Sequence, residues 1–331
     1  MLTPPGRLTS DKLAQVLSDG WGLTTASIDY RAVGFGSHHW EVVGADAVRW
    51  FVTADDLSLL QSPCEPDAAA SARLCAALAT VLELRDRGAA FVIAPVRTLT
   101  GEPLMLTDQR MGVALYPYVD GQSFCWGDFP TPEHRRGVLD MVIALHTAPA
   151  GARRHARAED FAVPHWDELE LELARDQNGA GRERGPFASL VAGLLAEHAA
   201  RIRRLLARYD DLVSEARRHP GRMVLTHGEP HPGNTMLTPG GWVLIDWDTV
   251  LLAPPERDLC NLDAGDGAII GGYEDATGTT LLPPLLELYR IRWDVADIAA
   301  DVSRLLRTHS GSLDDEKSWA GLCSIIGRLP A

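Results

Sequence analysis

Six polar side chains that could do chemistry lie close together in the last third of the 331-residue chain. They are His227, Glu229, His231 and Asn234, followed by Asp246 and Asp248. Glycine and proline at positions 228, 230, 232 and 233 predict an irregular loop around the first four. A loop braced by strands is a common way to present a functional site. We therefore expect the segment 226–258 to carry the chemistry of the protein.

The spacing of His227 and His231, with a glutamate between them, is superficially that of a zinc-binding pair. Such a pair binds zinc when a helix places both imidazoles on one face. Gly228 and the prolines at 230 and 232 break any helix here. A zinc site is therefore not expected.

Phosphoryl transfer suits the same residues better. A carboxylate on the loop could orient and deprotonate an attacking hydroxyl. An asparagine five residues later and an aspartate at the end of a strand could hold Mg²⁺ against the phosphates of a nucleotide, because this hard cation prefers oxygen ligands.

The segments HGEPHPGN, VLIDWD and LAPPERDL resemble the motifs of the aminoglycoside phosphotransferase family. The run IDWDTVLLAPPERDL is most similar to the spectinomycin-phosphotransferase branch of that family. The resemblance implies an α+β, two-lobe protein-kinase-like fold. Residues 1–120 would form a β-rich, nucleotide-binding N-lobe. Residues 121–331 would form a mostly helical C-lobe with the catalytic loop, the metal site and the acceptor site.

The resemblance also implies a role for each polar residue of the segment. Glu229 takes the place of the catalytic base, and His227 braces the catalytic loop beside it. Asn234 and Asp246 take the places of metal ligands, and Asp248 is a helper near the metal. Asp258 takes the place of a structural carboxylate behind the loop.

Two residues depart from the pattern of the family. The family has an aspartate where Glu229 stands, and the extra methylene moves the carboxylate by ~1.5 Å. Because a shift of about 1 Å can cost on the order of 100-fold in rate, we expect a retuned activity. The family also grips the phosphates with a lysine on the third strand, where this chain has Thr53. Arg73, in the helix expected over 67–87, is the best substitute, since arginine binds phosphate bidentately.

The resemblance is looser in the N-lobe, where two short segments take nucleotide-binding places. The glycine loop over the phosphates would contain Gly34, Gly36 and Ser37, and the hinge that faces the base would contain Tyr116, Pro117 and Val119. A plain hairpin turn explains the glycines equally well. A strand that ends before Gly121 explains the hinge residues nearly as well.

Candidates for the acceptor site lie on one predicted helix of the C-lobe. Tyr289, Trp293 and Asp297 recur at every fourth residue and share a helix face. An aromatic face with acidic groups suits a sugar-like cation, although the aromatic side chains could equally pack the interior of the C-lobe. Asp266 and Glu274, near a glycine-rich segment, are further candidates.

Hydrophobic periodicity predicts the elements that position these residues. We expect helices over 8–20, 67–87, 132–147, 187–218 and 281–308, and strands within 28–53, 91–98 and 111–119.

Composition narrows the class of protein. The chain is 46% hydrophobic and 23% charged, which is typical of a globular protein. A net charge of −14 argues against a nucleic-acid partner or an anionic membrane surface. Five cysteines without a C-x-x-C pair, and no apolar N-terminal stretch, favour a cytoplasmic protein. A monomer or a homodimer is expected.

The sequence thus predicts a small-molecule kinase that uses ATP or GTP with Mg²⁺. Its acceptor would be a hydroxyl of an aminoglycoside-like or aminocyclitol-like cation, as in antibiotic resistance or self-protection. Two alternatives stay open: a nucleotide-binding pseudokinase without phosphoryl transfer, and a nucleotidyl transferase that transfers AMP.

Overall fold

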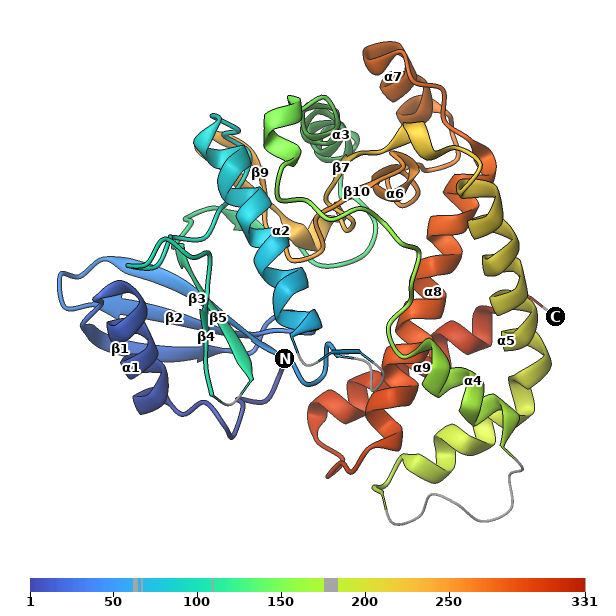
Figure 1. Cartoon of the computed structure of the whole chain (residues 1–331), viewed down its shortest axis with the longest axis horizontal. Helices are drawn as coiled ribbons and strands as arrows, with labels where there is room; N and C mark the ends of the chain where they lie inside the picture. The colour runs from blue at the N-terminus through green and yellow to red at the C-terminus, as the bar shows by residue number, and fades with distance from the viewer. Residues whose placement is uncertain (62–64, 67, 109, 176–183, 331) are drawn as a thin grey trace.

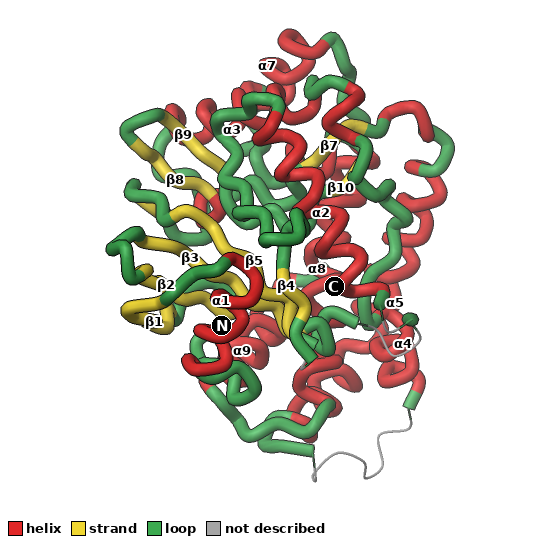
Figure 2. Tube along the Cα trace, turned by 60° about the vertical axis from the view of Figure 1, so that its left-hand side comes forward, coloured by secondary structure: helices red, strands yellow, loops and turns green. Residues whose placement is uncertain are grey.

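The structure is a computed structural model that describes residues 1–61, 65–66, 68–108, 110–175 and 184–330. A sheet-rich N-terminal part, the N-lobe, precedes a mostly helical C-terminal part, the C-lobe (Figure 1). Most strands gather on one side of the molecule, and helices α4 and α5 lie on the other (Figure 2). This is the order of elements that the sequence predicts.

The N-lobe is built on a five-stranded antiparallel sheet with the order β1-β2-β3-β5-β4. Its strands are β1 (Thr25–Arg31), β2 (His38–Gly44), β3 (Arg49–Asp56), β4 (Met105–Leu106) and β5 (Met111–Pro117). Trp40 and Val52, which face each other across β2 and β3, pack with Leu13 and Leu17 of helix α1 (Ser10–Trp21). Burial of these side chains fixes α1 on one face of the sheet.

Helix α2 (Ala69–Asp86) belongs to both lobes. Leu74 and Leu78 form a small apolar cluster with Ala114 of the sheet. Val81 and Leu84 instead belong to the large apolar core of the C-lobe. The second half of α2 precedes residue 120 in the sequence but packs in the core of the C-lobe. The predicted lobe boundary at residue 120 therefore stays a prediction.

The strand predicted over 91–98 is wrong. Val92 makes one isolated parallel bridge to Leu244 in the C-lobe, and the N–H of Val96 donates to the carbonyl of Leu115 in β5 at 2.7 Å. The apolar run therefore serves as a connection between lobes. Val92 and Pro95 are buried by this connection, and periodicity alone does not distinguish it from a strand.

The C-lobe contains two small sheets and most of the helices. β6 (Gln122–Ser123), β8 (Thr235–Thr238) and β9 (Gly241–Leu244) form one sheet, and β7 (Val224–Thr226) pairs with β10 (Leu251–Ala253) in the other. The helices are α3 (Pro132–His146), α4 (Trp166–Ala174), α5 (Ala188–Ala216), α6 (Glu256–Leu259), α7 (Ala268–Thr277), α8 (Pro283–Leu306) and α9 (Leu313–Arg328), with 3₁₀ turns at Ala150–Arg153, Pro220–Arg222 and Pro232–Asn234.

One large apolar core holds the C-lobe together. Val138, Met141 and Leu145 of α3 enter it, as their spacing predicts. Helix α8 is the central element and packs against α4, α5, α6 and α9. Within the described residues, no helix combines the length and the apolar character needed to cross a bilayer.

Candidate active site

The catalytic loop, residues 227–234, connects β7 with β8 and is held from behind by one carboxylate. Asp258 in α6 accepts hydrogen bonds from the backbone N–H of His227 at 2.8 Å and of Gly228 at 2.6 Å. Burial opposes the ionisation of Asp258, but the hydrogen bond from His146 and nearby positive charge bring its pKa below the ordinary value. The anchoring role predicted for Asp258 is confirmed.

Gly228 lets the loop lie directly on a buried guanidinium. Its φ is +103°, and a Cβ here would collide with the guanidinium of Arg257. Arg257 in turn donates to the hydroxyl of Thr226 at 2.8 Å and to the carbonyl of Thr249 at 2.9 Å. The end of β7, the catalytic loop and the start of β10 are thereby tied together just before Glu229.

His227 is a structural brace. Its Nε2 hydrogen-bonds the carbonyl of Ile245 at 2.9 Å, and its Nδ1 accepts the N–H of Glu229 at 3.2 Å. These partners fix the tautomer with the proton on Nε2. Burial lowers the pKa of His227 to about 4. A neutral ring with both nitrogens engaged holds the loop, which is the bracing role that the resemblance implies for His227.

Glu229 presents its carboxylate at the surface of the loop, with 39% of the side chain exposed. Burial by the surrounding protein and the charge of Asp248 raise the pKa of Glu229 to about 7. Its backbone carbonyl accepts a hydrogen bond from the side-chain amide of Asn234 at 3.1 Å. A carboxylate that is reachable by solvent and has a pKa near neutrality is suited to proton transfer.

Asn234 and Asp246 lie on adjoining turns of chain. The N–H of Ile245 donates to the carbonyl of Asn234 at 2.9 Å, which continues the ladder of the β8–β9 hairpin. Asp246 follows at once in the left-handed region with a φ of +64°. Few residues other than glycine adopt this conformation, although aspartate does so more readily than most. Strain of this kind is typical of functional positions.

Asp246 is exposed and Asp248 is half-buried, and metal binding by these carboxylates stays a prediction. Burial and the neighbouring charges of Asp248, Glu229 and Asp55 raise the pKa of Asp246 well above its ordinary value. Together with the amide of Asn234, these oxygen donors fit Mg²⁺. Across the described part of the chain, no three side chains of His, Cys, Asp or Glu form a ready-made metal cage.

Asp55 was missed by the sequence analysis. It lies two residues after Thr53 on β3, and side chains two apart in a strand share a face. Asp55 is 6% exposed, and burial together with the charge of Asp248 raises its pKa to about 7. Where the family has a lysine, this face therefore offers the hydroxyl of Thr53 and a carboxylate. Alternation along β3 was the signal that could have found it.

The glycine loop lies between β1 and β2, as predicted. Gly34 and Gly36 have φ values of +67° and +96°, which favour glycine. The hydroxyl of Ser37 donates to Asp55 Oδ1 at 2.5 Å. The end of the loop is thus tied to the strand face that approaches Asp248. Contact of this loop with phosphate stays a prediction.

Arg73 does not fill the place of the missing lysine. Its guanidinium pairs with Glu65 at 2.5 Å and donates to the carbonyl of Leu60 at 2.7 Å. Both partners belong to the connection between β3 and α2. The expectation that Arg73 grips phosphate is corrected on this evidence, because its donors are engaged by the connection that precedes its own helix.

The predicted hinge begins with Tyr116 and Pro117, the last two residues of β5. The hydroxyl of Tyr116 hydrogen-bonds Thr53. Burial, together with the charges of Asp55 and Asp246, raises the pKa of Tyr116 well above the ordinary value, so the side chain lies close to these carboxylates. Pro117 faces Trp50 at the end of the ladder. Pairing of the backbone at Pro117 and Val119 with a nucleotide base stays a prediction.

Two of the acceptor candidates face the catalytic loop. The ring of Trp293 lies 6.2 Å from that of His231 in an edge-to-face arrangement. Asp297, one turn further along α8, is close enough to raise the pKa of Glu229. Burial and the charge of Asp294 raise the pKa of Asp297 itself to about 6.

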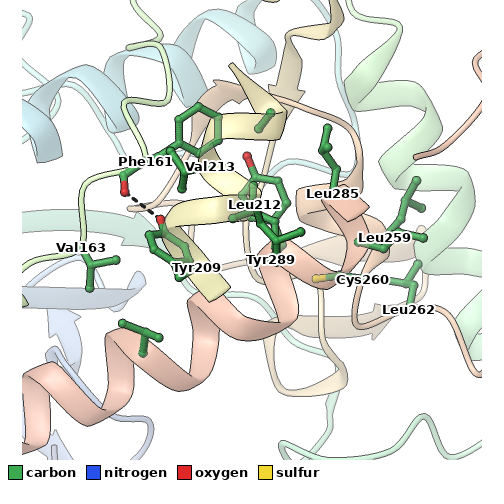
Figure 3. Close-up of a cluster of buried hydrophobic side chains, with 14 of the residues drawn as sticks. Phe161, Val163, Tyr209, Leu212, Val213, Leu259, Cys260, Leu262, Leu285 and Tyr289 are labelled. Atoms are coloured by element: carbon green, nitrogen blue, oxygen red, sulfur yellow. Dashed lines mark hydrogen bonds between the residues drawn. The ribbon is translucent and has the colours of Figure 1, made fainter. Parts of the chain in front are cut away.

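The other three acceptor candidates serve the structure of the C-lobe. Tyr289 is 1% exposed and lies in the apolar core beside Leu212 and Leu285 (Figure 3). Asp266 accepts the N–H of Ala268 at 3.0 Å as α7 begins. Glu274 accepts the N–H of Leu281 at 2.8 Å after α7 ends. These expectations are corrected, because one side chain is enclosed and the other two complete local hydrogen bonds.

Comparison with known proteins identifies the family of the chain. The model of the phosphotransferase enzyme family matches residues 39–297, and the chain belongs to this family. The protein StrN of Streptomyces griseus is 30% identical over 257 residues, which cover 73% of each chain.

Solved structures show the same fold. Spectinomycin phosphotransferase APH(9)-Ia, in complex with ADP and spectinomycin, superposes with a TM-score of 0.70 at 17% identity over 96% of this chain and 97% of that one. The microcompartment-associated aminopropanol kinase gives 0.59 at 15% identity over 96% and 95%. The amicoumacin kinase hAmiN, in complex with AMP-PNP and Ca²⁺, gives 0.58 at 11% identity over 98% and 95%. The predicted protein-kinase-like fold is confirmed.

Proposed function

We propose that the protein is a small-molecule kinase that transfers the γ-phosphoryl group of a nucleoside triphosphate to a hydroxyl of a cationic, aminocyclitol-like or aminoglycoside-like acceptor. The observation that supports this most is the pairing of Asn234 with Ile245, which sets Asn234 beside Asp246. The same loop presents Glu229 through the Asp258 anchor. One base and two metal-ligand positions are thereby available together.

In the proposed reaction the acceptor hydroxyl oxygen forms a bond to the γ-phosphorus as the bond from that phosphorus to the β–γ bridging oxygen breaks. The nucleoside diphosphate leaves, and the hydroxyl proton passes to the carboxylate of Glu229. A base acts best when its pKa lies near the working pH, and the raised pKa of Glu229, about 7, meets this condition. Trp293 and Asp297 of α8, which lie near His231 and Glu229 of the catalytic loop, would orient the acceptor.

Asn234 and Asp246, with Asp248 nearby, would hold Mg²⁺. When bound, this ion supplies positive charge that offsets the charge of the phosphates. The glycine loop and the Tyr116–Val119 hinge would receive ATP or GTP. Relatives of this fold solved with ADP, AMP and AMP-PNP with Ca²⁺ support a nucleotide and a divalent cation.

One observation favours the rival proposal of a nucleotide-binding pseudokinase. Thr53 and Asp55 occupy the strand face that carries a lysine in the family, and Arg73 is engaged elsewhere. A protein with this face could bind a nucleotide without turning it over.

The product of the nucleotide separates the proposals. Purified protein with ATP or GTP and Mg²⁺ would be incubated with a panel of aminocyclitols, aminoglycosides and macrolides. We expect release of ADP or GDP that depends on one class of acceptor. Thermal stabilisation by the nucleotide without any product would support the pseudokinase, and release of pyrophosphate would support nucleotidyl transfer.

A further inference from the structure

Three buried side chains form a hydrogen-bonded relay behind the catalytic loop. His146, the last residue of α3, has its Nε2 at 3.0 Å from Asp258 Oδ2 and its Nδ1 at 2.9 Å from the hydroxyl of Tyr273 in α7. His146 is 3% exposed, Tyr273 1% and Asp258 0%. The relay therefore joins three helices without solvent between them.

The direction of the relay follows from its chemistry. The carboxylate of Asp258 can only accept, so Nε2 of His146 must carry the proton that lies between them. Nδ1 is then an acceptor, and the hydroxyl of Tyr273 donates to it. Without this hydroxyl, Nδ1 becomes a buried acceptor with no donor, and the ring orientation that points the Nε2 proton at the carboxylate loses its second hydrogen bond.

Asp258 transmits this constraint to the catalytic loop. Its Oδ2 accepts hydrogen bonds from His146 Nε2 and from the backbone N–H of His227. Its Oδ1 accepts a hydrogen bond from the backbone N–H of Gly228. Rotation of the carboxylate would therefore loosen two consecutive peptide groups. Glu229 is the next residue, so its carboxylate would lose its fixed position.

We propose that His146 and Tyr273 are positioning residues, which hold Glu229 in place through Asp258 during phosphoryl transfer. This inference rests on the proposed function for its effect on turnover, but the relay itself can be tested without turnover. Simple packing of the interior predicts a different outcome, because Phe has the shape of Tyr and would fill the same space.

The decisive variant is Tyr273→Phe, with Tyr289→Phe as its matched control. Both tyrosines are 1% exposed, but among the described residues the Tyr289 hydroxyl has no hydrogen-bond partner. For Tyr273→Phe we expect kcat to fall between about 3-fold and 10-fold, the effect of one neutral hydrogen bond, with KM for the nucleotide unchanged. Tyr289→Phe should leave both constants unchanged.

Substitution of His146 tests the centre of the relay. His146→Leu removes the donor to Asp258, and we expect kcat to fall by about 100-fold, the cost of misplacing a catalytic group by about 1 Å. His146→Gln keeps an N–H donor and should recover part of that loss. Equal kcat in Tyr273→Phe and wild type, or no difference between the Leu and Gln variants, would overturn the proposal.

Amide hydrogen exchange provides the readout that does not need an acceptor. Exchange at His227 and Gly228 should be faster in Tyr273→Phe than in wild type and unchanged in Tyr289→Phe, because both amides donate to Asp258. If wild type shows no turnover but these amides respond, the proposed function fails and the relay stands. If wild type turns over and the amides do not respond, the relay fails and the function stands.

Discussion

The two halves of the candidate site are built in opposite ways. In the C-lobe, the catalytic loop and the turn at Asp246 follow the pattern of the family except at Glu229, and backbone hydrogen bonds to Asp258 and Asn234 fix them. In the N-lobe, the glycine loop and the hinge are in their expected places, but β3 offers Thr53 and Asp55 where the family has a lysine. The C-lobe half keeps more of the family's residue pattern than the N-lobe half does.

This difference suggests how a triphosphate would be held. With a carboxylate facing it from β3, its charge must be offset from the C-lobe side, where Asn234, Asp246 and Asp248 could hold a cation. Changes in the C-lobe half should therefore abolish activity. Changes in the N-lobe half should alter affinity, in some cases upward.

The largest effect is expected for Asp246→Asn. Loss of this carboxylate removes one position for a cation worth several kcal/mol of transition-state stabilisation, so turnover should fall by about 10³-fold. Stopped-time assays of nucleoside diphosphate release would measure it. Asp140→Asn, at an exposed position of α3, is the control, and turnover above one tenth of wild type in Asp246→Asn would contradict the assignment.

Glu229 should show the next largest effect. Glu229→Gln removes the proton acceptor but keeps the size of the side chain, so turnover should fall by about 10²-fold, the lower end for a general base. Calorimetric titration should show unchanged nucleotide affinity. Loss of affinity together with turnover would mean that Glu229 holds the loop or a ligand and is not the base.

Asp55→Asn tests the N-lobe half directly. Removing a negative charge that faces the phosphates should strengthen nucleotide binding by about 10-fold, or ~1.4 kcal/mol. Thr107→Ala, on the connection between β4 and β5, serves as a control outside the site. Weaker binding by Asp55→Asn would show that the carboxylate holds a ligand, and the contrast between the two halves would then need revision.

The same residue predicts a dependence of stability on pH in metal-free buffer. The pKa of Asp55 is raised from 3.8 to about 7 in the folded protein, so between these values the folded state binds more protons than the unfolded state, and stability falls as pH rises. The side chain of the Asp55→Asn variant cannot ionise, so this fall in stability with rising pH is absent from it. Its melting temperature should exceed that of wild type by more at pH 8 than at pH 5, and an equal difference at both would contradict the buried, raised pKa.

Arg73→Ala should have the smallest effect. Because its guanidinium is engaged by Glu65 and Leu60, nucleotide affinity should stay within about 2-fold of wild type, which is less than ~0.5 kcal/mol. Fluorescence titration with a labelled nucleotide would measure it. A 10-fold loss would restore Arg73 as a phosphate ligand.

The C-lobe half could be predicted from the sequence because its parts are close along the chain. Twelve positions and one tight hairpin separate Asn234 from Asp246, and glycine and proline shape the turns between strands. Periodicity also predicted the helices over 132–147 and 281–308, which are α3 and α8. These are local properties, which a sequence pattern records.

Long-range contacts could not be predicted in the same way. Asp55 and Asp248 approach each other from different lobes, and no local pattern links them. The spacing of Tyr289 and Trp293 shows that they share a face of α8, but not that the first half of the face meets the core while the second half meets the catalytic loop. The apolar run 91–98 likewise reads as a strand until its partners in both lobes are known.

The most direct test of the central claim is a crystal structure of the protein with Mg²⁺ and a non-hydrolysable ATP or GTP analogue. The account predicts a metal bound to the triphosphate, with the side chains of Asn234 and Asp246 among its ligands and the carboxylate of Glu229 facing the γ-phosphoryl group. A nucleotide bound away from residues 229, 234 and 246, or those three side chains turned to separate surfaces, would contradict it.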